Sequence, residues 1–199
     1  MNRTTIFSLL LLALIPVSCI YDGGWGQGVT GNGNVTKEVR DLSGFTGVHV
    51  SSGIDVHLSQ GDDFEVIVEA DENLMDVIET GVSGRMLEVG TDRYGIRRAR
   101  SKVVHVTLPR LTELKISSAG DCVGQTPFEC DDLELDISSA GDLTLEVDAE
   151  TIDVEISSSG DARLSGSAET FDVSLSSAGD LHAFDLVAGK VKVRVSSAG

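Results

Sequence analysis

The sequence predicts an all-β protein, a β-solenoid with coils of about 20 residues. Two observations favour this fold class. Gly accounts for 22 of the 199 residues while aromatic side chains make up 5%, which is typical of turn-rich β structure. A motif of the form Ser-Ser-x-Gly-Asp also recurs along the second half of the chain, and each copy follows a segment that alternates apolar and polar residues.

The first 34 residues are expected to precede the folded body. Residues 1–18 read as a signal peptide, because Arg3 is followed by an apolar run too short to span a membrane. Ser18 directly before Cys19 is similar to a bacterial lipoprotein signal, in which the Cys becomes the lipidated first residue. An ordinary secretory signal with an incidental Cys is the alternative. Residues 19–34 are then a lipidated Cys and a flexible Gly-rich tether.

Residues 35–110 predict a β-rich head whose strands are less regular and lack the short repeat. Residues 71–78 begin with acids and space their apolar residues as a short helix does, and residues 61–63 indicate a hairpin-like turn. A basic cluster stands out in this acidic chain. It comprises Arg93, Arg97, Arg98, Arg100 and Lys102. The cluster is either a solvated loop or a docking surface for an acidic partner, such as the acidic coils of a second copy.

Residues 111–199 predict the regular β-helix. The motif copies begin 21, 19, 19 and 20 residues apart, at the positions Ser117, Ser138, Ser157, Ser176 and Ser196. Period-two alternation before each copy indicates strands with one buried face, so equivalent residues of successive coils should stack about 4.8 Å apart. The expected inward ladders are Leu133, Ile152, Phe171 and Val191; Leu135, Val154, Val173 and Val193; and Ile137, Ile156, Leu175 and Val195. In each turn, Gly is expected to adopt a positive φ and the following Asp to cap the turn.

Negative charge is concentrated on these coils. The formal net charge is −17, and residues 117–189 hold 17 acidic residues against one base, Arg163. Nucleic acid and a bare anionic bilayer are therefore disfavoured partners. The aspartates that end the motif should form one ladder, Asp121, Asp142, Asp161 and Asp180. Each of them either only caps its turn or helps to hold Ca²⁺, the single cofactor that the sequence brings into question.

Cys122 and Cys130 align with an inward position and a small corner position of the later coils, so both should point into one coil. In an oxidising envelope they either form a disulfide or remain buried free thiols. The chain ends at Gly199, before the Asp of its last motif, which predicts a truncated sequence. An uncapped solenoid end would favour homo-oligomers.

Catalytic signatures are weak. The four His have no metal-ligand spacing, and no nucleophile-elbow motif occurs. Phe171 belongs to an inward ladder, and Phe128 and Phe184 precede turns, which argues against strong lectin activity. Two classes remain open: a non-enzymatic binding or structural envelope protein and, as the alternative, a β-helix that binds or degrades polysaccharide.

Three parts of the chain together resemble a known family. They are Phe45-x-x-Val48-x-Val50-Ser-Ser-Gly-Ile-Asp-Val56, then Glu69-Ala70-Asp71-Glu72-Asn73-Leu74, then the stacked Ser-Ser-x-Gly-Asp motifs. Over about residues 40–199 the chain resembles the putative auto-transporter adhesin family with a head GIN domain, with Gly53-Ile54-Asp55 in place of Gly-Ile-Asn. The resemblance implies a right-handed, single-stranded parallel β-helix in the envelope of a Gram-negative bacterium, and it supplies no catalytic residues. With the lipoprotein signal, it implies an outer-membrane lipoprotein that faces the periplasm or the surface and binds an envelope protein or a glycan.

Overall fold

The structure, a computed structural model, describes residues 28–197. Within this range the chain forms fifteen strands and one 3-10 helix of three residues. The elements are β1 (Val29–Thr30), β2 (Val35–Arg40), β3 (Gly47–Val50), β4 (Asp55–Gln60), β5 (Glu65–Asp71), η1 (Glu72–Leu74), β6 (Ile78–Ser83), β7 (Met86–Thr91), β8 (Ile96–Arg98), β9 (Lys102–Leu108), β10 (Glu113–Ile116), β11 (Asp121–Gly124), β12 (Phe128–Ser139), β13 (Asp142–Ser158), β14 (Asp161–Ser177) and β15 (Asp180–Ser196).

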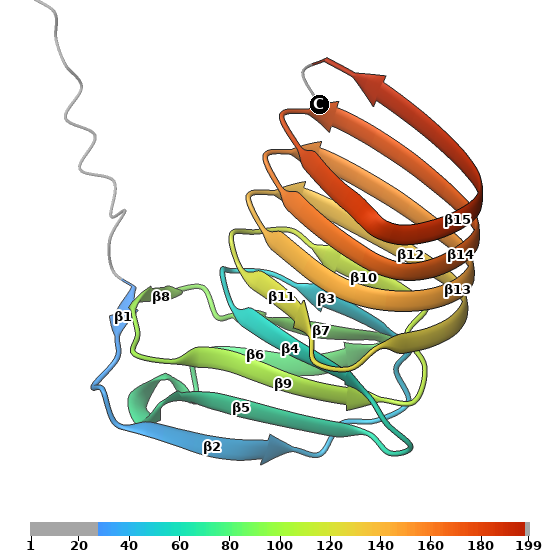
Figure 1. The fold of residues 1–199 in the computed structure, drawn as a ribbon. Coiled ribbons are helices and arrows are strands. Elements are labelled where there is room, and N and C mark those ends of the chain that lie inside the picture. Colours follow the sequence, from blue (N-terminus) through green and yellow to red (C-terminus); the bar gives the residue numbers. More distant parts are fainter. Residues whose placement is uncertain (1–27, 198–199) are drawn as a thin grey trace, which may run out of the picture.

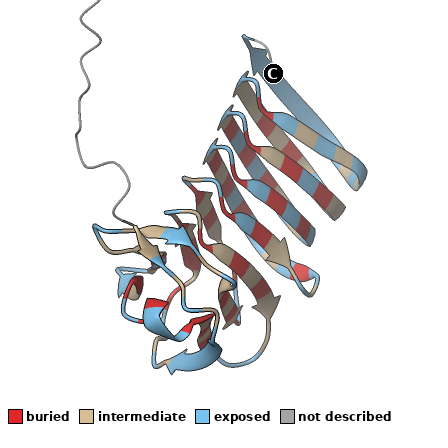
Figure 2. Cartoon of the chain, turned by 90° about the vertical axis from the view of Figure 1, so that its left-hand side faces the viewer, coloured by how far each residue is buried: buried red, intermediate tan, exposed pale blue. Residues whose placement is uncertain are grey.

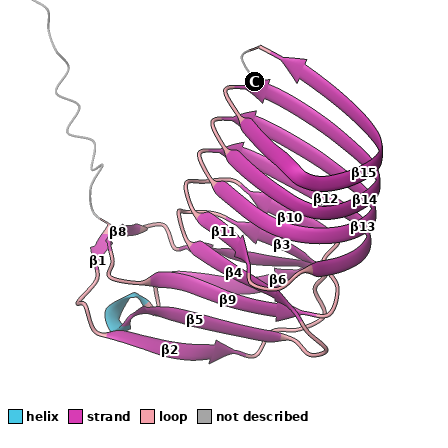
Figure 3. Ribbon diagram, viewed as in Figure 1, coloured by secondary structure: helices cyan, strands magenta, loops and turns pink. Residues whose placement is uncertain are grey.

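The strands wind into a β-solenoid, which confirms the predicted fold class (Figures 1 and 3). Every described strand except β1 and β8 belongs to one continuous hydrogen-bonded sheet. One face of the solenoid contains β2, β5, β9, β4 and β11, and the other contains β10, β3, β7 and β6. In the upper coils a single strand of 17 residues, such as β13, bends around the corner and serves both faces.

The three inward ladders have the predicted register. Leu133 pairs with Ile152, which pairs with Phe171, and the two other ladders continue in parallel with them. Their members on β12 and β13 are at most 3% exposed. On β15 the ladders end at Val191, Val193 and Val195, which are 53–56% exposed because no described coil lies above them (Figure 2). The stacked rungs thus form one core through all coils.

The turns use their residues differently from the sequence-based prediction. Positive φ belongs to the second Ser of the motif, as in Ser139 (φ 101°), Ser158 (φ 79°) and Ser177 (φ 69°), and not to the Gly. The Gly is required by space. A Cβ on Gly160 would lie 2.6 Å from Ile137 Cγ2 and 3.0 Å from the carbonyl oxygen of Gly141. The motif therefore keeps successive turns in close contact, which a side chain at the Gly position would prevent.

Residues 35–110 do not form a separate head. β3 and β4 stack in parallel register under β10 and β11, and β7 and β9 stack under β3 and β4. The chain therefore lays down its second coil before its first and then returns above both. The predicted boundary near residue 110 lies inside one continuous sheet.

Three local predictions are corrected. The helix expected over residues 71–78 is only η1, because Ile78 already enters β6 and is 2% exposed. The turn at 61–63 does not close a hairpin, since β9 inserts between β4 and β5 and pairs with both. The tether expected over 19–34 does not include 28–34, where β1 pairs with β8. The signal peptide, Cys19 and residues 20–27 lie outside the described residues.

Candidate functional site

Asp71 fastens the N-terminal arm, residues 28–34, to the body. It is the one charged residue buried among the described residues, at 1% exposed. Its carboxylate accepts the N–H groups of Gly33 at 3.0 Å, Arg100 at 3.2 Å and Ser101 at 3.2 Å. Burial acts to raise the pKa of Asp71, but these three backbone donors bring the pKa below its usual value. Asp71 therefore joins the arm, β5 and the loop before β9.

Asn73 completes this attachment. Its side-chain nitrogen donates to the Thr30 carbonyl at 2.9 Å, and its side-chain oxygen accepts the N–H of Asn32 at 2.8 Å. The Asp-Glu-Asn-Leu motif thus binds the arm and does not start a helix. This role needs contacts across about 40 positions of sequence, so no local pattern could have indicated it.

The structure groups four of the five predicted basic residues. The side chains of Arg93, Arg97, Arg98 and Arg100 are exposed and make no salt bridge to any described residue. Arg93 stacks on Tyr94, with Cζ 4.7 Å from the ring centroid. Lys102 differs, because its Nζ donates to the Gly53 carbonyl and lies 3.4 Å from the Asp55 carboxylate. We define the four arginines as the arginine patch.

The predicted aspartate ladder is in register along one edge of the coils. Asp121 lies beside Asp142, Asp142 beside Asp161, and Asp161 beside Asp180. Asp55 extends it by one coil, and its carboxylate accepts the Asp121 N–H at 3.2 Å. Within residues 28–197, no group of three or more His, Cys, Asp or Glu is arranged to hold a metal ion. The Ca²⁺ ladder stays a prediction.

The two cysteines occupy the predicted positions, Cys122 beneath Leu143 and Cys130 beneath Ala149. Both are free thiols, so the structure has the second of the two alternatives and not the disulfide. Burial raises the pKa of Cys122 to about 12. Burial, with the nearby carboxylates of Asp131 and Asp132, raises that of Cys130 to about 11.

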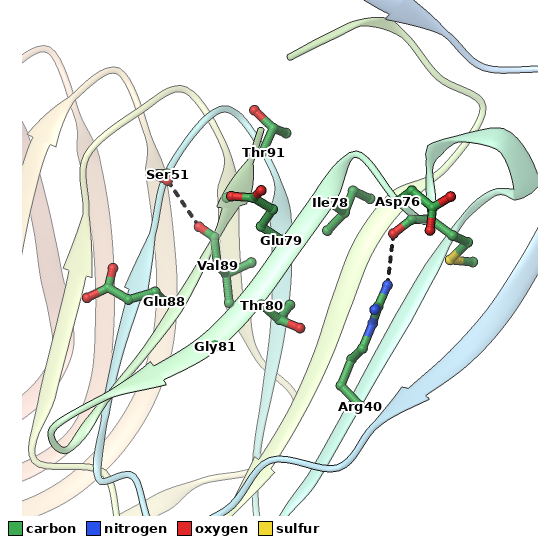
Figure 4. A pocket seen from close by; sticks show the side chains of 12 residues that line it. Arg40, Ser51, Asp76, Ile78, Glu79, Thr80, Gly81, Glu88, Val89 and Thr91 are labelled. Carbon is green, nitrogen blue, oxygen red and sulfur yellow. Dashed lines mark hydrogen bonds between the residues drawn. The ribbon is translucent and has the colours of Figure 1, made fainter. Parts of the chain in front are cut away.

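A groove of about 600 Å³ opens at the first coils, beside β6 and β7 (Figure 4). Its charged lining residues are Arg40, Asp76, Glu79 and Glu88, and aromatic side chains do not contribute to the lining. Arg40 Nη2 donates to the Met75 carbonyl at 2.8 Å, while its Nε and the Thr80 hydroxyl are buried without a partner within residues 28–197. The groove is a polar closure of this end of the core, and it offers no apolar surface on which a ligand could stack.

A second hollow surrounds Phe184 on β15. His182 pairs with Arg163 but Asp185 pairs with Ser165, so β15 contains one residue more than β14 in this interval. The extra residue forms a β-bulge that leaves Phe184 94% exposed. Phe184 therefore lies inside a strand and not before a turn as predicted. The adjoining hollow of about 390 Å³ is lined by Thr144, Arg163, Leu164, Ser165, His182, Phe184 and Asp185.

His57 and His105 are cross-strand neighbours on β4 and β9, as the sequence indicated, with ring centroids 5.1 Å apart. His105 Nε2 lies 3.1 Å from a carboxylate oxygen of Glu69. Hydrogen bonds from Lys37 and His105 lower the pKa of Glu69. These contacts form a surface network that connects β2, β5, β9 and β4.

A family model described as "Putative auto-transporter adhesin, head GIN domain" matches residues 44–199, which is most of the chain. The chain belongs to this family. Membership of an adhesin family indicates a protein of the cell envelope or surface. None of the curated proteins matches the chain. Among residues 28–197, no helix is long and apolar enough to cross a membrane.

Three solved structures show the same fold. A putative adhesin from Bacteroides fragilis is 16% identical, with a TM-score of 0.80 over 85% of this chain and 79% of that one. A putative adhesin from Parabacteroides merdae is 21% identical, with a TM-score of 0.68 over 85% and 80%. A structure from Parabacteroides distasonis, described as a putative lipid binding protein, is 18% identical, with a TM-score of 0.68 over 84% and 80%.

The head motif of this family is itself a solenoid turn. Ser51 and Ser52 precede Gly53, and Ser52 has φ 60° like the second Ser of the later copies. The strands on either side, β3 and β4, continue the stack below β10 and β11. Sequence reasoning missed this copy because it lacks one residue of the Ser-Ser-x-Gly-Asp pattern. The signal was the string Val-Ser-Ser-Gly-Ile-Asp-Val, which aligns with Ile-Ser-Ser-Ala-Gly-Asp-Cys around Ser117.

Proposed function

We propose that this chain is a non-enzymatic binding module of the cell envelope, anchored in the outer membrane of a Gram-negative bacterium through a lipidated Cys19, and that it contacts carbohydrate through Phe184. The observation that carries the proposal is the β-bulge that exposes Phe184 beside a polar hollow. Bulges re-aim single side chains and are frequent beside binding sites.

The surroundings of Phe184 suit a sugar ring. A pyranose presents an apolar face of C–H groups, which an exposed aromatic ring can cover, and a rim of hydroxyl groups. Thr144, Arg163 and His182 form one polar row across three coils, and Ser165 and Asp185 form part of a second. Such rows repeat at about the strand spacing of 4.8 Å and supply both donors and acceptors. The hollow thus combines one apolar platform with convergent polar groups.

The same hollow supports binding in preference to hydrolysis. Glycoside hydrolysis uses two carboxyl groups on either side of the scissile bond. The lining here includes one carboxylate, that of Asp185. The aspartate ladder lies on an outer face of the coils and not in a cleft. Membership of a family of putative adhesins agrees with a binding role.

The anchor is supported by the Ser18-Cys19 sequence after an apolar run. Several acyl chains on one terminus would give stable attachment, because each buried CH₂ contributes about 0.8 kcal/mol. Metabolic labelling with a fatty acid tests this part. We expect label in the wild-type chain and none after Cys19→Ser, and an unlabelled wild-type chain would contradict the anchor.

A glycan array probed with the chain from residue 19 onward tests the binding part. We expect binding to a subset of glycans, with no release of sugar products on prolonged incubation. Release of products would favour the polysaccharide-degrading alternative. Capture of an envelope protein in place of any glycan, undiminished by Phe184→Ala, would favour a protein ligand and contradict the proposal.

A further inference from the structure

We propose that the arginine patch, Arg93, Arg97, Arg98 and Arg100, is a contact surface for the phosphate groups of anionic membrane lipids. The inference rests on the proposed function in one respect, since it needs the anchor at Cys19. It adds a second, electrostatic membrane contact and a defined orientation of the solenoid on the bilayer.

The patch lies where the described chain begins. β1 pairs with β8, and the Gly31 N–H donates to the Arg98 carbonyl at 2.7 Å, so the arm runs directly beside the arginines (Figure 1). Nine residues separate Cys19 from Gly28. A chain of that length spans at most about 30 Å in any conformation. An anchored Cys19 therefore keeps the patch close to the lipid headgroups.

The arginines are free to bind phosphate. All four are exposed, and none makes a salt bridge to another described residue. Asp92, the nearest acid in sequence, already accepts the N–H groups of Tyr94 and Gly95 at 2.9 and 3.2 Å. Guanidinium groups bind phosphate with two parallel hydrogen bonds, and basic residues next to a membrane anchor are attracted to anionic leaflets. Tyr94, which is 51% exposed under Arg93, adds an amphipathic ring suited to the interface.

The net charge of −17 opposes this contact only if acids and patch face the membrane together. Residues 117–189 hold 17 of the acids, and they form the coils from β11 to β15, which Figure 1 shows stacked away from β1 and β8. At physiological salt, interactions beyond about 8 Å are largely screened. The anionic membrane therefore interacts with the local positive patch and repels the distant acidic coils. Both effects point β15, with Phe184, away from the bilayer.

Chemical footprinting of the lipidated full-length chain tests the inference. The protein is reconstituted in vesicles of phosphatidylcholine alone or with 30% phosphatidylglycerol, and phenylglyoxal modification of each arginine is followed by mass spectrometry. Arg194, exposed on β15, is the internal control. We expect modification of the patch to slow at least about five-fold in the anionic vesicles, the factor that one such contact supplies. Arg194 should react equally in both vesicles, and 0.5 M NaCl should remove the difference.

Charge-removing variants give the matched comparison. In an Arg97→Gln/Arg98→Gln chain, protection of Arg93 and Arg100 should weaken, whereas Arg194→Gln should leave it unchanged. Equal reactivity of the patch in both vesicle types would overturn the inference while leaving the anchor intact. Protection that appears without vesicles and grows with protein concentration would also overturn it and assign the patch to the acidic coils of a second copy. A chain that fails to float with either vesicle would contradict the anchor itself, and with it this inference.

Discussion

At the residue scale, Asp71 shows how one carboxylate substitutes for a missing strand pairing. Three backbone donors from the arm and from the loop before β9 converge on it, and a Cβ on Gly31 would collide with its carboxylate oxygen. The arm is too short and too rich in Gly to bury apolar surface, so its position depends on polar contacts. The position of the arginine patch depends on the same contacts.

Replacing Asp71 by Asn should loosen this attachment. A neutral amide accepts weaker hydrogen bonds than a carboxylate and brings an NH₂ group against backbone donors. We expect the melting temperature at pH 7 to fall by several degrees and amide exchange to accelerate over residues 29–34. Asp63→Asn, at an exposed position, is the matched control and should change neither quantity. Unchanged exchange in the arm of Asp71→Asn would contradict this role.

Acid should have an effect of known sign at Asp71. Because its pKa is lowered in the folded state, its contribution to the free energy of unfolding is complete above about pH 4. That contribution is lost as the pH falls through the folded-state pKa. Urea denaturation from pH 6 to pH 2 should therefore show a larger loss in the wild type than in Asp71→Asn. Parallel losses in both proteins would be inconsistent with the lowered pKa.

The free thiols of Cys122 and Cys130 should react slowly in the folded protein. With pKa values of about 12 and about 11, few of them are thiolates at pH 8. In a Cys19→Ser chain, we expect a thiol reagent to count two groups after denaturation without reductant, and to modify them far more slowly under native conditions. A count of zero after denaturation would instead establish the disulfide.

At the element scale, the Ser-Ser-x-Gly-Asp turn combines two requirements. The second Ser accepts a positive φ, and the Gly lets one turn lie against the turn below. Sequence reasoning located the turn but reversed these roles. A Gly in a turn is normally placed by its φ preference, and only the stacked neighbour reveals that space is the constraint here.

Gly160→Ala tests the requirement for space. Its Cβ would meet Ile137 Cγ2 at 2.6 Å and the Gly141 carbonyl oxygen at 3.0 Å, so neighbouring coils must separate. We expect a loss of about 1–3 kcal/mol in the free energy of unfolding, as for other overpacked sites. Gly81→Ala, where no atom lies within 4 Å of the added Cβ, should change stability by less than about 0.5 kcal/mol. Equal effects of the two substitutions in denaturant titrations would rule out the close-contact explanation.

At the scale of the whole molecule, the repeat made most of the solenoid predictable. Ladders such as Leu135, Val154 and Val173 follow from period-two alternation and constant spacing. The stacking of β3 and β4 between β9 and β11 could not be predicted, because it reverses the order of the chain over some 50 residues. The bulge at Phe184 was announced by a spacing of 20 in place of 19. Nothing local indicated which residue of that coil would be the extra one.

The acidic coils should behave as a screened array of like charges. Neighbouring aspartates of the ladder repel one another, and salt weakens that repulsion. We expect NaCl to raise the melting temperature, Ca²⁺ at equal ionic strength to do no more, and Asp142→Asn to be nearly neutral. A Ca²⁺-specific rise of several degrees that Asp142→Asn abolishes would demonstrate a cation site on the ladder.

The binding function is tested most directly by titrating a glycan selected on the array into three proteins: the wild type, Phe184→Ala and Val187→Ala. Val187 is a matched control, because it is also on β15 and is 74% exposed but does not line the hollow. Loss of one aromatic platform should lower the association constant about ten-fold, which corresponds to about 1.4 kcal/mol. We predict this loss for Phe184→Ala alone, with Val187→Ala indistinguishable from the wild type. Equal affinity of all three proteins would contradict a carbohydrate site at Phe184.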